Sequence, residues 1–90
     1  MNIYVAKPSN RVAQMIVEQA QAWKNENVFK DFKACYFAFC DLARIINNTF
    51  GLTGLICVHC RMDRNAESGE VTVMYKGPGK RSKVICLINF

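Results

Sequence analysis

The chain has 90 residues, of which 51% are hydrophobic and 21% charged, and its formal net charge is +5. This length is too short for two ordinary domains, and this hydrophobic content is too high for a disordered chain. A barrel or nucleotide-binding fold with its own substrate domain is excluded for the same reason of length. We therefore expect a single basic globular domain over residues 1–90.

The chain shows no segment typical of export or membrane insertion. Its first ten residues include Lys7 and Pro8 and lack the apolar core of a secretory signal. The longest uncharged stretch, residues 45–60, is interrupted by asparagines and glycines. It falls short of the roughly 18 apolar residues that a membrane span needs. We expect a soluble, cytoplasmic protein that does not contact a membrane.

The first third of the chain predicts a strand followed by a helix. Residues 2–6 are typical of a short strand, which Lys7-Pro8 ends before an N-cap at Ser9 or Asn10. Residues 11–24 carry polar side chains at three- and four-residue spacing opposite an apolar face. This pattern predicts an amphipathic helix.

A second helical pattern follows a short polar connection, residues 25–27, that contains a capping Asn. So short a link favours two antiparallel helices, and one kinked helix is the alternative. We expect the second helix over residues 28–50, with Gly51 as its C-cap. Its apolar face comprises Val28, Phe32, Cys35, Phe39, Leu42 and Ile46. Its polar face comprises Lys30, Lys33, Asp41, Arg44 and Asn48.

After this segment, the spacing of apolar residues changes from the period of a helix to the two-residue alternation of strands. Inward and outward side chains alternate over residues 56–63 and 70–76, which predicts two strands. Residues 77–80 predict a turn, and residues 84–88 are a continuous apolar run typical of a central strand. The inward residues of the first of these strands are Ile56, Val58, Cys60 and Met62.

The predicted order is thus β-α-α-β-β-β. Because the connections are short, neighbouring elements run antiparallel, and the first strand can pair beside the last. The fold class is α+β: a two-layer sandwich in which two helices pack on one face of a four-stranded antiparallel sheet.

Nearly all the net charge lies near the C-terminal end of the chain. Residues 1–70 contribute only +1, whereas residues 71–90 hold four cations and no acid. These cations surround a Gly-Pro-Gly turn and are Lys76, Lys80, Arg81 and Lys83. Such a hairpin can follow a phosphate backbone, contact an acidic protein surface, or simply keep a small protein soluble. No RRM, KH, zinc-finger or double-stranded RNA-binding signature accompanies it.

Phe37 is the one hydrophobic residue that the predicted core leaves unused. It lies in the middle of the polar face of the second helix, with Lys33 and Arg44 beside it. An exposed aromatic residue ringed by charges resembles an interface anchor, although single exposed apolar residues are also ordinary. Self-association through this face is one form that such an interface could take.

Five cysteines lie in apolar, periodic segments rather than in turns: Cys35, Cys40, Cys57, Cys60 and Cys86. An odd number in such positions argues against a disulfide scaffold and predicts buried free thiols in a reducing compartment.

The Cys57-Val-His-Cys60 segment has zinc-binding residue types. Strand alternation sends Cys57 and Cys60 to opposite faces, so we predict no metal there. His59, the only histidine, lies about 7 Å from Cys57 along a strand, too far for a Cys–His nucleophile. We expect no cofactor and no catalytic residue.

These features predict a small non-enzymatic binding protein. It would occlude a partner, either nucleic acid or a nucleic-acid-handling protein, through the cationic hairpin and Phe37. In size and charge the chain resembles small single-domain inhibitors and regulators of phage or mobile-element type.

Two alternatives remain. In its order of elements and basic character the chain also resembles RelE-type ribonuclease toxins. That resemblance implies cleavage residues on the sheet, for which the candidates are Tyr75, Lys76, Lys80 and Arg81. The other alternative is an oligomer-forming structural subunit that uses the Phe37 face or an unpaired sheet edge.

Overall fold

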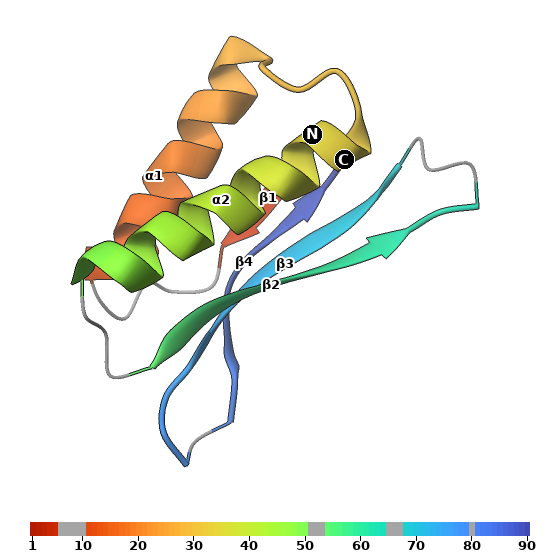
Figure 1. Ribbon diagram of the computed structural model, residues 1–90. Coiled ribbons are helices and arrows are strands. Elements are labelled where there is room, and N and C mark those ends of the chain that lie inside the picture. Colours follow the sequence, from red (N-terminus) through yellow and green to blue (C-terminus); the bar gives the residue numbers. More distant parts are fainter. Residues whose placement is uncertain (6–10, 51–53, 65–67, 80) are drawn as a thin grey trace.

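A computed structural model shows two helices on one face of a four-stranded antiparallel sheet, which confirms the predicted fold class and element order (Figure 1). The structure describes residues 1–5, 11–50, 54–64, 68–79 and 81–90. The elements are β1 (Asn2–Val5), α1 (Arg11–Glu26), α2 (Phe32–Phe50), β2 (Leu55–Met62), β3 (Gly69–Lys76) and β4 (Lys83–Asn89).

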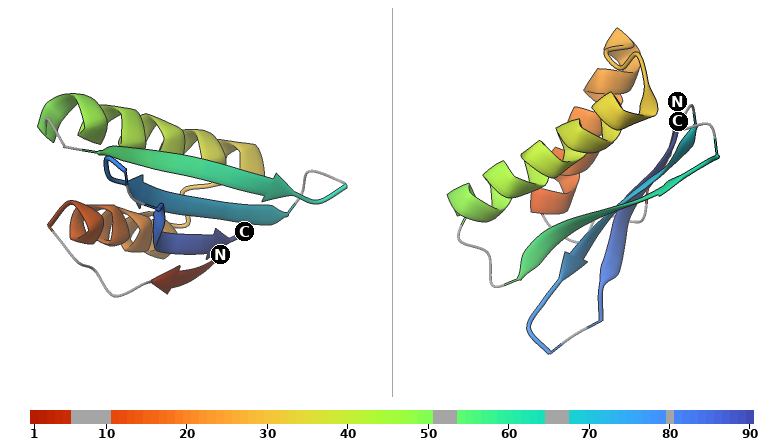
Figure 2. Two further views of the ribbon diagram at one scale, coloured as in Figure 1. Left: turned by 90° about the horizontal axis from the view of Figure 1, so that it is seen from below. Right: turned by 45° about the vertical axis from the view of Figure 1, so that its right-hand side comes forward.

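The strands lie in the order β1-β4-β3-β2. The apolar β4 is therefore an inner strand, and β1 pairs beside it, both as predicted. This pairing places Asn2 opposite Asn89 and brings the two ends of the chain side by side (Figure 2). The edges of the sheet are the short β1 and the long β2.

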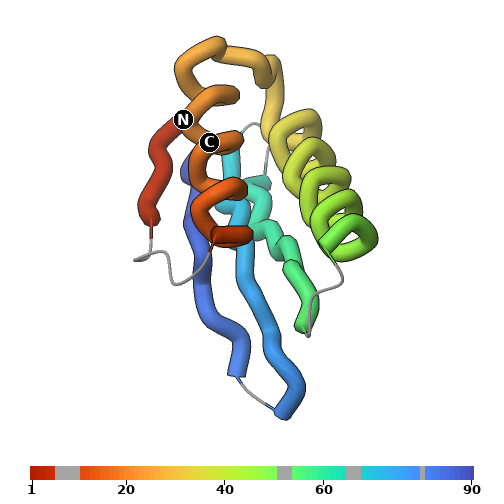
Figure 3. Tube along the Cα trace, turned by 90° about the vertical axis from the view of Figure 1, so that its left-hand side faces the viewer, coloured from red at the N-terminus to blue at the C-terminus, as the bar shows by residue number. Residues whose placement is uncertain are grey.

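Both helices bury one face of the sheet, as Figure 3 shows from the helix side. The core residues on the helices are Ala13, Ile16, Ala20, Phe32, Cys35, Phe39, Ala43 and Ile46. Those on the sheet are Ile56, Val71, Val73, Ile85, Cys86 and Ile88. Between the helices, the Trp23 ring of α1 packs edge-on against Phe39 of α2, with 5.1 Å between ring centroids.

The connection between the helices ends α1 sharply, so the kinked-helix alternative is wrong. Asn27 adopts a left-handed backbone conformation, with φ 51°. The Val28 N–H donates to the Trp23 carbonyl at 3.3 Å, and the Asn27 N–H donates to the Lys24 carbonyl at 3.1 Å. These two bonds form a Schellman motif, which satisfies the last carbonyls of α1.

The second helix begins at Phe32 rather than at Val28 as predicted. The Asp31 carboxylate accepts a hydrogen bond from the Ala34 N–H at 2.8 Å, which is the geometry of an N-cap. Because this cap fixes the helix start, Val28 lies outside the helix and is exposed instead of belonging to its apolar face.

Phe37 is not the only large hydrophobic residue outside the core, contrary to the prediction. Helix ends, the outer side of α2, strand edges and the uncovered side of the sheet leave further side chains in solvent. The exposed ones are Tyr4, Val5, Val28, Phe37, Ile45, Phe50, Leu55, Met62 and Val84.

Three predicted features fall outside the described residues: the N-cap at Ser9 or Asn10, the C-cap at Gly51, and the position of Lys80. Over the described ranges, neither helix combines the length and hydrophobicity that crossing a membrane requires.

Candidate functional site

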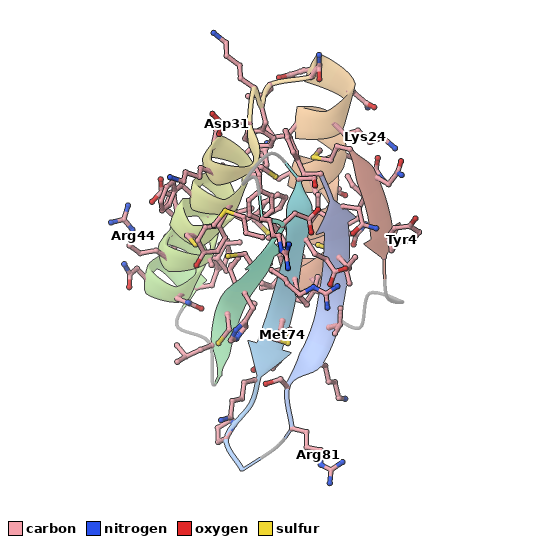
Figure 4. All side chains as sticks on the ribbon, turned by 90° about the vertical axis from the view of Figure 1, so that its right-hand side faces the viewer. Tyr4, Lys24, Asp31, Arg44, Met74 and Arg81 are labelled. Carbon is pink, nitrogen blue, oxygen red and sulfur yellow. The ribbon has the colours of Figure 1, made fainter. Side chains whose placement is uncertain are left out.

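The face of the sheet that turns away from the helices is uncovered, and Figure 4 looks onto it. Because side chains alternate along a strand and paired residues share a face, the register determines which residues lie there. One row crosses all four strands and comprises Tyr4, Leu87, Thr72 and His59. The aromatic residue of this row, Tyr4, is 57% exposed, and His59 is exposed at the opposite edge.

Two further rows flank this central row on the uncovered face. The polar row lies at the end where the chain termini meet and comprises Asn2, Asn89, Glu70 and Arg61. The apolar row lies toward the β3–β4 turn and comprises Cys57, Met74 and Val84. Beyond it, Lys76 pairs with Leu55. The face therefore presents ring and aliphatic groups at its centre and cations toward both ends.

The predicted cationic hairpin (residues 76–83) extends this same sheet beyond the helix layer. Gly79 adopts φ 65° in its turn, a conformation that glycine reaches without strain. Lys76, Arg81 and Lys83 are exposed, and none forms a salt bridge with another described residue. Figure 4 shows Arg81 at the tip, away from both helices. These cations are available to an anionic ligand.

The predicted binding residues do not form one surface. Lys33, Phe37 and Arg44 lie on α2, where Phe37 is 58% exposed. Phe37 is two residues from the buried Phe39, which places it about 160° around the helix from the sheet. Figure 4 shows Arg44 on α2 and Arg81 on the hairpin, well apart. The outer side of α2 and the hairpin are therefore two separate candidate surfaces.

Apart from Lys76, the residues of the uncovered face were not among the predicted site residues. In the sequence, the alternation of side chains over residues 70–76 distinguishes the two faces of a single strand. It could not indicate that Tyr4 and His59 belong to a single row, because that depends on the register of three strand pairs.

Tyr75 and Lys76, two of the candidates for a RelE-type site, lie on opposite faces of the sheet. Tyr75 pairs with the buried Ile56 on the helix side and is itself half-buried, whereas Lys76 points to the uncovered face. The described candidates for cleavage therefore do not converge on one point.

Only two of the five thiols are buried, so the prediction of buried thiols is correct for Cys35 and Cys86 alone. Burial raises the pKa of each of these two thiols to about 11. Cys60 is exposed, and Cys40 and Cys57 are half-buried. For Cys57 and Cys60 the reason is that β2 is an edge strand, which has a neighbouring strand on one side only.

As expected from strand alternation, Cys57 and Cys60 point to opposite faces, since Cys57 pairs with Met74 and Cys60 with the buried Val71. Within the described ranges, no three or more histidine, cysteine, aspartate or glutamate side chains gather in a group that could hold a metal ion.

Cys60 instead lies near a tyrosine of α2. A hydrogen bond with the Cys40 thiol is the main cause that raises the pKa of Tyr36, and Cys60 adds to the effect. The Tyr36 ring also contacts Phe37, with 5.6 Å between ring centroids. This contact restricts the position of the exposed Phe37 ring.

A groove of about 390 Å³ follows the contact between α2 and β2. It is lined by Cys40, Ala43, Arg44, Asn47, Asn48, Leu55, Ile56 and Val58. The Asn47 amide is not free for a ligand, because it accepts from the Ile56 N–H at 2.8 Å and donates to the Ile56 carbonyl at 3.1 Å. The groove is thus a site of helix–strand attachment.

Comparison with known proteins gives no match to a family model, a curated protein or a solved structure. The function is therefore inferred from the chemistry of these surfaces.

Proposed function

We propose that this chain is a small non-enzymatic binding protein that holds a single strand of nucleic acid on its uncovered sheet face and cationic hairpin. The observation that carries this proposal is their continuity. The row from Tyr4 to His59 and the exposed Lys76 belong to one sheet face, which leads directly into the hairpin.

The cations lie where the phosphates of such a strand would run. Lys76 and Arg81 are at the hairpin end of the face, and Arg61 is at the other end. Lys83 pairs with Tyr75 and therefore lies on the other side of the hairpin. Glu70, opposite Arg61, is the one acid in the described rows of this face. Each phosphate that a cation neutralises releases counterions, so the binding depends strongly on salt concentration.

The central row supports contact with unpaired bases. A base presents a flat surface that stacks on an aromatic ring, and Tyr4 and His59 offer rings at the two edges of the row. Leu87 and Thr72 lie between them. A duplex keeps its base faces stacked internally, so this arrangement favours a single strand.

Occlusion follows from the same geometry. A strand held against the sheet by both its bases and its phosphates is not accessible to other proteins on that side. This would make the chain an inhibitor or regulator of the process that uses the strand, without any chemical step of its own.

The test is fluorescence anisotropy with short labelled single-stranded RNA and DNA over a range of salt concentrations. Replacing Lys76 and Arg81 together by Ala should weaken binding about tenfold or more and reduce the slope of log K against log salt by about 1.4, since each lost phosphate contact contributes about 0.7. Tyr4→Ala should weaken binding roughly five- to hundredfold and leave this slope unchanged.

The matched control replaces Lys24 and Lys30 together by Ala. Both are exposed and lie outside the sheet, and their loss changes the net charge equally. The proposal is wrong if the wild-type chain does not bind at low salt, or if this control loses as much affinity as the hairpin variant.

A further inference from the structure

The outer side of α2 carries a row of exposed residues at four-residue spacing: Lys33, Phe37, Asp41 and Ile45. Side chains at this spacing form a continuous ridge along a helix. Phe37 is 58% and Ile45 56% exposed, so the ridge is apolar at two of its four positions. It faces away from the core and is not covered by any other described element.

The charges of this outer row of α2 are symmetric about Phe37. Lys33 lies four positions before it and Asp41 four positions after it. We propose that a second copy of this chain binds the outer row, forming a two-fold dimer in which antiparallel α2 helices cross at Phe37. Each Lys33 then meets Asp41 of the other copy, and the two Phe37 rings meet at the axis.

The residues around Phe37 allow such a contact. Ala34 and Ala38 beside the ridge are small, so the partner ridge can settle into the neighbouring groove. Ridges of this spacing interlock when two helices cross at about 50°. The contact of Phe37 with Tyr36 already restricts the Phe37 ring, which lowers the entropy lost on association.

The charges select the antiparallel orientation. Within one chain Asp41 accepts a hydrogen bond from Arg44 at 3.2 Å, and both side chains are largely in solvent. In the antiparallel pair Asp41 also meets a lysine of the second copy. A parallel pair in the same register would place Lys33 against Lys33 and Asp41 against Asp41, and these like charges repel.

The dimer is independent of the proposed nucleic-acid interface. The outer row lies on the side of α2 opposite the residues that pack on the sheet, so the uncovered sheet face of each copy stays free. Because one pair of helices buries little area, the dimer should be weak and reversible.

The test is sedimentation equilibrium of the purified chain at concentrations up to about 1 mM, the range that weak interfaces require. The wild-type chain should dimerise. Lys33→Asp and Asp41→Lys should each weaken dimerisation about tenfold, because the symmetry turns two attractive contacts into repulsive ones. An equimolar mixture of the two variants should recover dimers, since each Asp at position 33 then meets a Lys at position 41.

Arg11→Asp is the control, because it makes the same charge change at an exposed position on α1. It should dimerise like the wild type, and circular dichroism should show equal helix content in all variants. A wild-type chain that stays monomeric, single variants that dimerise normally, or a mixture that stays monomeric would each overturn the proposal.

Discussion

Asn47 is the residue whose side chain makes the most specific contact between the helix layer and the sheet. Its amide forms two hydrogen bonds with the backbone of Ile56 near the start of β2. β2 is an edge strand, and unpaired backbone groups on an edge are open to other strands. Asn47 therefore both attaches α2 to β2 and closes part of this edge.

Asn47→Ala should lower the free energy of unfolding by about 1–3 kcal/mol, because it leaves the backbone groups of a buried residue without partners. Asn48→Ala is the matched control, since Asn48 is the exposed neighbour of Asn47 and should change stability by less than about 0.5 kcal/mol. Urea unfolding followed by circular dichroism measures both values. Equal stabilities of the two variants would show that the Asn47 hydrogen bonds contribute nothing.

The buried thiols make the fold sensitive to alkaline pH. Burial raises the pKa of Cys35 and Cys86 from 9.0 to about 11. As pH rises above about 9, the unfolded chain loses these protons first, so their contribution to stability is complete below pH 9 and is lost by about pH 11. The urea midpoint should fall over this range.

Replacing Cys35 and Cys86 by Ala should flatten that pH dependence. Replacing Cys57, which lies on the uncovered face of the sheet, by Ala should leave it unchanged. If all three proteins show the same fall of the urea midpoint between about pH 9 and 11, the buried thiols are not its cause.

At the scale of elements, caps rather than hydrophobic periodicity determine where the helices end. The apolar pattern of α2 extends back to Val28, yet the helix starts at Phe32, where Asp31 caps it. Periodicity reports which face of a helix is buried, whereas the ends depend on which side chain accepts the first free N–H groups.

Asp31→Ala should therefore lower the free energy of unfolding by about 1 kcal/mol, because the Ala34 N–H loses its acceptor. Asp31→Asn keeps a side-chain oxygen in place and should retain most of the stability. Thermal unfolding of the two variants separates them. A loss that is equal in both would point to the charge of Asp31 rather than to its hydrogen bond.

At the scale of the whole molecule, the sequence was sufficient to predict the arrangement of helices and strands, but not which residues share an exposed face. The change of period and the apolar run of residues 84–88 predict the layers and the inner position of β4 correctly. To predict the uncovered face, the pairing of the strands must also be known, because Tyr4 and Leu87 lie side by side on it and come from opposite ends of the chain. No local pattern contains that register.

The local pattern was also insufficient to predict which hydrophobic residues are exposed. The predicted helix and strand faces left only Phe37 outside the core, but Leu55 is 59% exposed on the edge strand β2. An edge residue has a neighbouring strand on one side only, so its apolar side chain fits the strand pattern without being buried.

The most direct test of the proposed function is to map the contact by NMR, following backbone amide shifts of the isotope-labelled chain during titration with a single-stranded oligonucleotide. We expect the largest shifts on the uncovered face and the hairpin, at Tyr4, Thr72, His59 and Arg81, and small shifts on the outer row of α2. Saturating shifts confined to α2, or no shifts at low salt, would contradict the proposal that the sheet face and hairpin bind nucleic acid.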